Sequence, residues 1–260
     1  MGELKSIISV KKLSFSYGQN AILHDINLEI HSSAFTVILG QNGSGKSTLL
    51  RLMAGLLKPE KEKVFISEVD ISYLNLKSKA KMLGFLGQKH KAVFPFTVEE
   101  VVMTGRAAHI RITPGKQDYL IVSEVLEKAG IFHLKDSYYT ELSGGEQQLV
   151  MIARVLAQQA KVLLLDEPTT HLDFCNQERV LSLIKNLTND GLTVVAVLHD
   201  PNHAFLYGDN FVFLKNGKIV HPSENSLPWD ASFLENIYET KVNAIPYDGK
   251  ALIIPSKSRS

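Results

Sequence analysis

The sequence predicts an α/β fold in which a mostly parallel sheet is covered by helices on both faces. Short apolar runs such as VLLLD (162–166) and TVVAV (193–197) alternate with segments of helical periodicity. Continuous apolar runs are typical of strands that are buried on both faces, as in parallel sheets. A glycine-rich turn between a strand and a helix, at residues 40–47, also indicates this fold class.

The N-terminal part predicts strands first and then a helix. SIISVKKLSFSY, HDINLEI and FTVILG alternate like strands within residues 6–40 and end in a glycine-rich turn, and we expect the fold to include an antiparallel β subdomain. From Lys46 the pattern becomes helical, and it ends near Gly55 and Pro59. A short strand in KEKVFISEVD, a short helix and GFLGQ follow, and GFLGQ ends at Gln88.

Residues 89–141 read as helices, in TVEEVVMTGRAAH and DYLIVSEVLEKAG, and predict a helical subdomain. We expect it to be inserted into one catalytic core made of residues 1–88 and 142–260. The next helix begins at SGGEQQLVMIARVLAQQ, where Ser143 and Glu146 have the spacing of a capping box.

The last hundred residues continue the alternation and end in a predicted β tail. A helix is expected from about Phe174, then the strand LTVVAVL, then another helix. Asn-Gly at 216–217 and Asp-Gly at 248–249 lie between strand-like runs, which is typical of hairpins. The tail therefore covers about residues 240–260.

Composition and charge bear on nucleic-acid binding, on disulfide formation and on membrane insertion. The 260 residues are 45% hydrophobic and 21% charged with a net charge of +1, which does not favour binding to nucleic acid. The single cysteine, Cys175, cannot form an internal disulfide. We expect no signal peptide in MGELKSIISVKK and no membrane span, because no run approaches 18 apolar residues. If the protein serves transport, another polypeptide must form the pore.

Residues 40–47, GQNGSGKS, match the pattern G-x-x-x-x-G-K-[ST] between a strand and a helix. In such a phosphate loop the backbone N–H groups and the helix N-terminus face the phosphates. Lys46 is expected to reach the β- and γ-phosphates, and the Ser47 hydroxyl to bind Mg²⁺. The predicted residues of this ATP site are Gly40, Gln41, Asn42, Gly43, Ser44, Gly45, Lys46, Ser47 and Thr48.

The strand VLLLD places two carboxylates at its C-terminal end. Ligands bind at that edge of open α/β sheets. We expect Asp166 to hold Mg²⁺, mainly through the water shell of the metal, and Glu167 to polarise the attacking water. A solvated acidic strand end is the plainer alternative.

The residues LSGGE (142–146), followed by QQLVMIARVLA, resemble the signature sequence of ATP-binding cassette (ABC) proteins. The order of phosphate loop, signature and Asp-Glu strand is also that of the family. The resemblance covers essentially the whole chain and implies a P-loop NTPase core. Ser143, Gly144, Gly145 and Glu146 would offer backbone N–H groups at a helix N-terminus, a second anion site.

Further roles are implied by the resemblance alone. Tyr17 matches the aromatic residue that stacks on adenine, and Gln88 the glutamine that joins Mg²⁺ and water to the helical subdomain. Asp173 matches the aspartate that crosses the dimer interface, and His199 the histidine that contacts the γ-phosphate. Each has a structural alternative; Asp173, for example, would also serve as a helix N-cap. KEKVFISEVD has glutamates where relatives often turn on glycine.

The family resemblance implies an ATPase that works as a head-to-tail dimer at the cytoplasmic face of the membrane. One copy's signature would complete the ATP site of the other, and separate permease subunits would carry the cargo. EPTTHLDFCNQ, VVMTGRAAH and VNAIPYDGKALIIP look similar to ATPases of importers for iron–siderophore complexes, haem and cobalamin. Such importers also use an extracytoplasmic binding protein.

Two alternatives remain at this point. The chain could be the energy subunit of an exporter, which would differ only in its permease. A non-transport ABC ATPase is disfavoured, because the chain has one phosphate loop and no sustained heptads between that loop and the signature.

Overall fold

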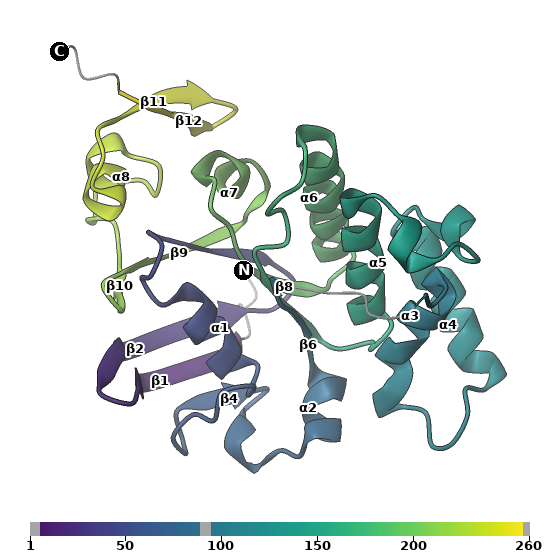
Figure 1. Cartoon of the computed structure of the whole chain (residues 1–260). Coiled ribbons are helices and arrows are strands. Elements are labelled where there is room, and N and C mark those ends of the chain that lie inside the picture. The colour runs from purple at the N-terminus through teal and green to yellow at the C-terminus, as the bar shows by residue number, and fades with distance from the viewer. Residues whose placement is uncertain (1–5, 89–94, 257–260) are drawn as a thin grey trace.

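The computed structural model describes residues 6–88 and 95–256, and it centres on a mixed sheet (Figure 1). In the described part of the chain this sheet has six strands, and all neighbours are parallel except β10 and β9. In spatial order they are β10 (Lys218–Val220), β9 (Asn210–Lys215), β3 (Phe35–Leu39), β8 (Thr193–Val197), β7 (Val162–Asp166) and β6 (Leu83–Leu86). The predicted mostly parallel sheet is confirmed.

Both faces of the sheet are covered, as the apolar strands predict. Every residue of β3, β7 and β8 is buried. Along β7, Leu163 and Leu165 belong to one hydrophobic core and Val162 and Leu164 to another, because successive side chains of a strand point to opposite faces. The first core includes residues of α5, α6 and α7, and the second includes α1 and the antiparallel strands. These helices are α1 (Lys46–Met53), α5 (Gly144–Leu156), α6 (Phe174–Asn189) and α7 (Pro201–Tyr207).

The N-terminal strands form the antiparallel sheet that the sequence predicts. Its order is β2–β1–β4–β5, and a 3₁₀ turn and α2 connect it to β6. The bounds are β1 (Ser6–Tyr17), β2 (Asn20–His31), β4 (Val64–Ile66), β5 (Val69–Asp70), the 3₁₀ turn Ile71–Tyr73 and α2 (Leu76–Met82). Ser67 and Glu68, which join β4 to β5, have φ of 47° and 70°. The chain thus makes a left-handed turn here without glycine.

A helical segment lies beside the sheet, at the right of Figure 1. It holds α3 (Val98–Met103), α4 (Lys116–Lys128) and 3₁₀ turns at Thr104–Ala108, Phe132–Leu134 and Tyr139–Glu141. Arg106 is buried and donates to the Ala157 carbonyl over 2.8 Å and to Gln159 over 2.9 Å. These bonds fasten the segment to the end of α5. The predicted start of the subdomain, at residues 89–94, lies outside the described residues.

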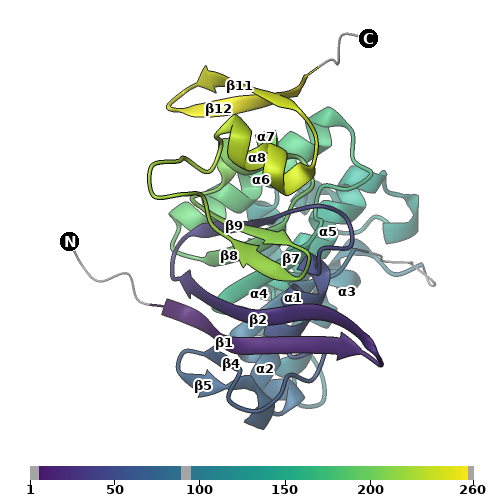
Figure 2. The ribbon, with the colours of Figure 1, turned by 90° about the vertical axis from the view of Figure 1, so that its left-hand side faces the viewer.

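The C-terminal part forms the two predicted hairpins. β9 and β10 are joined at Asn216-Gly217, and β11 (Val242–Tyr247) and β12 (Lys250–Pro255) at Asp248-Gly249. All four turn residues have φ between 46° and 72°, as a type I′ turn requires. The helix α8 (Ala231–Tyr238) precedes the second hairpin, which lies at the opposite end of the molecule from the antiparallel sheet (Figure 2).

Within residues 6–88 and 95–256, no helix has both the length and the apolar character needed to cross a bilayer.

Substituting Gly105 tests how closely the helical segment packs on α5. A Cβ at this position would lie 2.0 Å from the Arg154 carbonyl oxygen, so the backbone must shift to accept it. We expect Gly105→Ala to lower the free energy of unfolding by about 1–3 kcal/mol, the usual cost of overpacking. Urea unfolding followed by circular dichroism measures this change.

Gly115→Ala is the matched control, because the nearest atom to its Cβ would be 3.9 Å away. Its unfolding free energy should stay within about 0.5 kcal/mol of the wild type. Equal unfolding midpoints for both variants would contradict the close packing at Gly105.

Candidate functional site

The phosphate loop, residues 40–47, joins the end of β3 to the start of α1. Gly43 and Gly45 have φ of 79° and 104°, in the left-handed region that favours glycine. At Gly40 a Cβ would lie 2.1 Å from the Leu214 carbonyl oxygen, so a side chain does not fit. A cavity of about 240 Å³ opens over the loop. Its lining residues are Ile22, Asn42, Gly43, Gly45, Lys46, Ser47, Thr48 and Glu167.

Lys46 is buried at the base of this cavity. Its Nζ donates to the carbonyls of Gly40 and Gln41, both over 2.8 Å. Burial lowers the pKa of Lys46, and the nearby carboxylates of Glu167 and Asp166 partly raise it. Lys46 therefore places a hydrogen-bond donor and a cationic side chain beside the loop, where a phosphate group could accept from it.

Ser47 lines the same cavity and, together with the buried Asp166, forms an oxygen-rich corner next to it. The Ser47 hydroxyl donates to Asp166 Oδ1 over 2.7 Å, and Arg51 Nη2 lies 3.5 Å from Asp166 Oδ2. That Oδ2 is buried and has no hydrogen bond from the described residues. Burial raises the pKa of Asp166, while Ser47 and Arg51 lower it.

The corner fits Mg²⁺ better than a transition metal. Hydroxyl and carboxylate oxygens are the ligands that Mg²⁺ prefers, and the ion usually keeps several waters and phosphate oxygens. Among the described residues there is no group of three or more His, Cys, Asp or Glu side chains that could hold a metal on their own. The buried Asp166 Oδ2, which accepts no hydrogen bond from the described residues, is available to such an ion.

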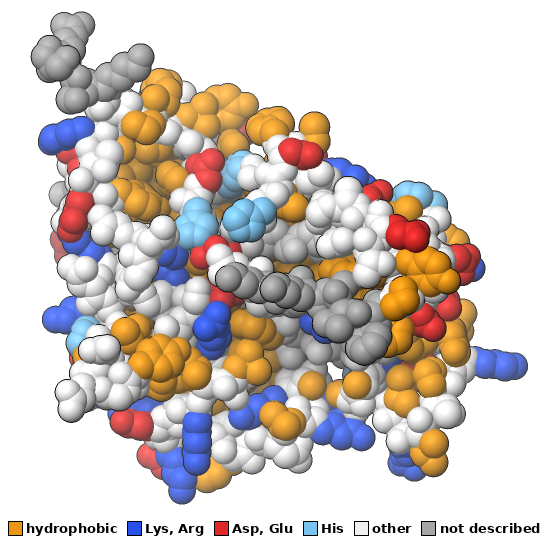
Figure 3. Space-filling view, viewed as in Figure 1, with side chains coloured by type: hydrophobic (Ala, Val, Ile, Leu, Met, Phe, Trp, Pro, Cys, Tyr) orange, Lys and Arg blue, Asp and Glu red, His pale blue; other side chains and the backbone are white. Residues whose placement is uncertain are grey.

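The Glu167 carboxylate contacts side chains from two neighbouring strand ends and from its own loop. Gln88 Nε2 donates to Glu167 Oε2 over 2.5 Å, the Thr170 hydroxyl donates to the same oxygen over 3.2 Å, and His199 Nε2 lies 2.7 Å from Oε1. Gln88, Glu167 and His199 follow β6, β7 and β8, whose carboxyl ends meet at one edge. Histidine and acidic side chains gather near the centre of this face (Figure 3).

Glu167 also has a strained backbone. Its φ is 56°, in the left-handed region, although it carries a side chain and precedes Pro168. Such a residue costs on the order of 1–3 kcal/mol and persists only where its surroundings hold it.

The signature segment, residues 142–146, caps α5 as predicted. The Ser143 side chain accepts from the Glu146 N–H, and Glu146 Oε2 accepts from the Ser143 N–H over 2.9 Å and from its hydroxyl over 2.7 Å. These bonds from Ser143 lower the pKa of Glu146. A Cβ on Gly145 would lie 2.2 Å from Asn176 Cγ, so α5 and the start of α6 touch at this glycine.

The signature segment is not part of the phosphate-loop cavity. None of residues 143–146 is among the described residues that line it, and neither is Asp173. Asp173 is exposed and caps α6 by accepting from the Asn176 N–H over 2.8 Å. The phosphate loop and the signature segment are therefore separate elements of one chain.

Tyr17 lies at the edge of the site rather than in it. It ends β1, is 45% exposed and contacts Phe15 edge-on at 5.0 Å between ring centroids. It is not among the residues that line the phosphate-loop cavity in the described chain. The ring is therefore free to receive a flat group from solvent.

Three residues of the site were not predicted from the sequence: Ile22, Arg51 and Thr170. Arg51 lies four residues after Ser47 on α1, so helical spacing places both on one face and could have identified it. Ile22 is on β2 and Thr170 is in the loop after β7, and no local pattern marks either.

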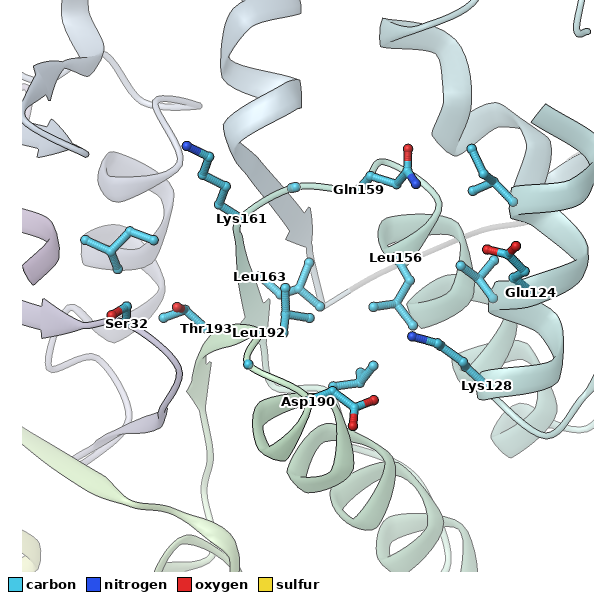
Figure 4. Close-up of a pocket in the computed structure, with 16 residues that line it drawn as sticks. Ser32, Glu124, Lys128, Leu156, Gln159, Lys161, Leu163, Asp190, Leu192 and Thr193 are labelled. Carbon is cyan, nitrogen blue, oxygen red and sulfur yellow. The ribbon is translucent and has the colours of Figure 1, made fainter. Parts of the chain in front are cut away.

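A larger cavity of about 520 Å³ lies at the opposite edge of the sheet, near the start of β7 and β8 (Figure 4). Its base is apolar, with Leu156, Leu163 and Leu192, and α4 contributes Glu124 and Lys128. None of the predicted site residues lines it. Because ligands of open α/β sheets bind at the carboxyl ends of strands, this cavity is not the candidate site.

Comparisons with known proteins point to one family. Residues 23–170 match the family model described as ABC transporter. The chain is 38% identical to the Bacillus subtilis ABC transporter ATP-binding protein YvrA over 90% of its own length and 54% of that protein. It thus spans about half of YvrA. It is 36% identical to the ferric enterobactin transport ATP-binding protein FepC of Escherichia coli, over 94% of this chain and 92% of FepC.

Solved structures agree with these relatives. A structure described as an inward-facing metal-chelate type ABC transporter matches with a TM-score of 0.83 and 29% identity, over 97% of this chain and 98% of that one. A dimeric, post-hydrolysis structure of the ATP-binding cassette MJ0796 bound to ADP and Pi matches with a TM-score of 0.72 and 30% identity. The match covers 83% of this chain and 97% of that one.

Proposed function

The chain belongs to the ABC transporter family, and on this premise we propose that it hydrolyses ATP to drive uptake of a metal chelate through separate membrane subunits. The observation that carries the proposal is the Glu167 carboxylate, held by Gln88 and His199 at the rim of the phosphate-loop cavity. A cavity for phosphate with a fixed carboxylate beside it suits attack of water on a phosphoanhydride.

Binding of the triphosphate is assigned to the phosphate loop. Lys46 would exchange its two carbonyl partners for phosphate oxygens, and the loop N–H groups and the α1 N-terminus would complete the cradle. Tyr17 would stack on the adenine. Its exposed ring at the end of β1 supports this role.

Ser47 and Asp166 would hold Mg²⁺, with Gln88 reaching it from the end of β6. When bound, the ion neutralises charge on the phosphate oxygens. Ser47 Oγ and Asp166 Oδ1 already lie 2.7 Å apart, so they can share one ion after small movements.

Glu167 would orient the attacking water and accept its proton. Gln88 and Thr170 keep one carboxylate oxygen in place by donating to it, and His199 holds the other. His199 would in turn contact the γ-phosphate.

The active form would be a head-to-tail dimer of this chain. Ser143 and the glycines of the signature segment do not line the phosphate-loop cavity of their own copy, so a second copy would bring the two anion sites together. The resemblance to the dimeric MJ0796 cassette with ADP and Pi supports this arrangement. Asp173, exposed at the start of α6, would cross the interface.

The names of the relatives support membrane partners of the importer type. FepC is by name the ATP-binding protein of ferric enterobactin transport, and the solved neighbour is of metal-chelate type. The cargo of this chain would therefore be an iron–siderophore complex, haem or cobalamin, delivered by an extracytoplasmic binding protein. The chain would sit at the cytoplasmic face, and residues 89–141 would carry movement from Gln88 to the permease.

Glu167→Gln tests the hydrolytic role. The amide keeps the shape of the side chain but cannot accept a proton, so turnover should fall about 10²- to 10⁴-fold while ATP binding is retained. Phosphate release and titration with a fluorescent ATP analogue measure the two properties. Wild-type turnover in this variant would remove Glu167 from the role.

Two further variants accompany Glu167→Gln: the first is a control, and the second tests nucleotide binding. Glu178→Gln, at an exposed position on α6, should behave as the wild type.

Lys46→Ala should weaken nucleotide binding itself by about 10- to 100-fold, because charge-assisted hydrogen bonds are lost.

Cross-linking tests the head-to-tail dimer. Asn42→Cys and Ser143→Cys, combined in a Cys175→Ser background because Cys175 is exposed, should form a disulfide between two copies when MgATP is present. Either cysteine alone should give no such product. Absence of cross-linking with nucleotide, in protein that still binds ATP, would refute the arrangement.

The importer assignment is tested with its membrane partner. The chain, purified from detergent-solubilised membranes, should bring with it a polypeptide with membrane-spanning helices.

Vesicles that hold both proteins, with ATP on the side of this chain, should take up a ferric siderophore only when its binding protein is added outside. Outward movement of cargo would identify an exporter instead.

A further inference from the structure

The helix α5, which begins at the signature segment, is hydrogen-bonded to the peptide that follows Glu167. Gln148 lies in the second turn of α5, and its Nε2 donates to the Pro168 carbonyl over 2.7 Å. The Gln148 side chain is half-buried between α5 and the loop after β7. The signature helix thus touches the residue next to the proposed general base.

The hydrogen bond from Gln148 matters because the backbone of Glu167 is strained. A left-handed residue before proline needs outside support. Proline has no N–H, so the carbonyl is the backbone group through which Pro168 can be held. Within the same loop, the Thr170 N–H donates to the Glu167 carbonyl over 3.3 Å.

The helix α6 supports the same loop from the opposite side. Gln177 Nε2 donates to the Thr169 carbonyl over 3.4 Å, and Asn176 packs against Gly145 and bonds to Asp173. The loop from Glu167 to Asp173 is therefore held between α5 and α6. A movement of α5 by about 1 Å away from this loop would break its bond to Pro168, because a hydrogen bond of 2.7 Å is lost beyond about 3.5 Å.

We propose that Gln148 is a positioning residue that ties the signature helix of one copy to that copy's own Glu167. When a triphosphate bound to the second copy engages Ser143, α5 is drawn into place and Gln148 holds the Glu167 carboxylate in its reactive position. Each site of the dimer then becomes competent only when the other site is filled. This inference rests on the proposed head-to-tail function.

Gln148→Met tests the role, because methionine has the same length and no donor. We expect kcat to fall about 10- to 100-fold, as a displacement of about 1 Å at a reacting group would cause. The Hill coefficient for ATP should fall toward 1, whereas the Kd for ATP of the isolated chain stays unchanged. Gln148→Lys, which restores an N–H donor of sufficient reach, should recover most of the turnover.

Gln147→Met is the matched control. Its amide lies next along α5 but donates to the Tyr139 and Leu142 carbonyls, over 3.2 Å and 3.0 Å, within the segment that precedes the helix. Its kcat and Hill coefficient should match the wild type. If Gln148→Met does not fold, Gln148→Asn replaces it, because the shorter amide keeps the polarity but cannot reach Pro168.

The outcomes separate this inference from the proposed function. Unchanged kcat and Hill coefficient in Gln148→Met, with ATP-dependent cross-linking intact, would overturn the role of Gln148 and leave the ATPase dimer standing. Equal losses in Gln147→Met and Gln148→Met, without recovery in Gln148→Lys, would show a general loss of helix stability and overturn it too. Failure of wild-type cross-linking would instead refute the head-to-tail function on which the inference rests.

Discussion

The contacts of the Glu167 carboxylate with Gln88 and His199 are the interaction on which the site depends. They exist because β6, β7 and β8 are adjacent and parallel, so the residues that follow each strand emerge at one edge. The same edge receives the phosphate loop from β3, the other neighbour of β8. Strand order, rather than any single loop, therefore brings together residues that are far apart in the chain.

A second constraint is that the signature segment does not line the phosphate-loop cavity of its own chain. The phosphate loop and the signature segment each end in a helix N-terminus with capping or glycine geometry, but they belong to different helices and line different surfaces. In the proposed head-to-tail dimer, a twofold axis would use the same two surfaces twice. In that dimer, the bond from Gln148 to the loop that follows Glu167 would link the two sites inside each copy.

Local patterns predicted much of this from the sequence. The capping box of Ser143 and Glu146 and the Asn-Gly and Asp-Gly turns depend on neighbours within a few residues, and the structure confirms them. The bond between Ser47 and Asp166 joins residues 119 positions apart, so a motif can suggest both partners but not their contact. The Gln148–Pro168 bond and the φ of Glu167 depend on how α5 packs, which no local pattern records. The left-handed Ser67–Glu68 turn likewise forms without the glycine that would have marked it.

The two hydrogen bonds from Lys46 to the carbonyls of Gly40 and Gln41 have a consequence for how phosphate groups would enter the loop. The Lys46 ammonium supports the curved shape of the loop by bonding to the carbonyls of Gly40 and Gln41. Entry of the phosphates is then an exchange of acceptors, with little net change in the number of hydrogen bonds. In the proposed ATPase, the phosphates would therefore enter a loop whose curvature is set by its own lysine.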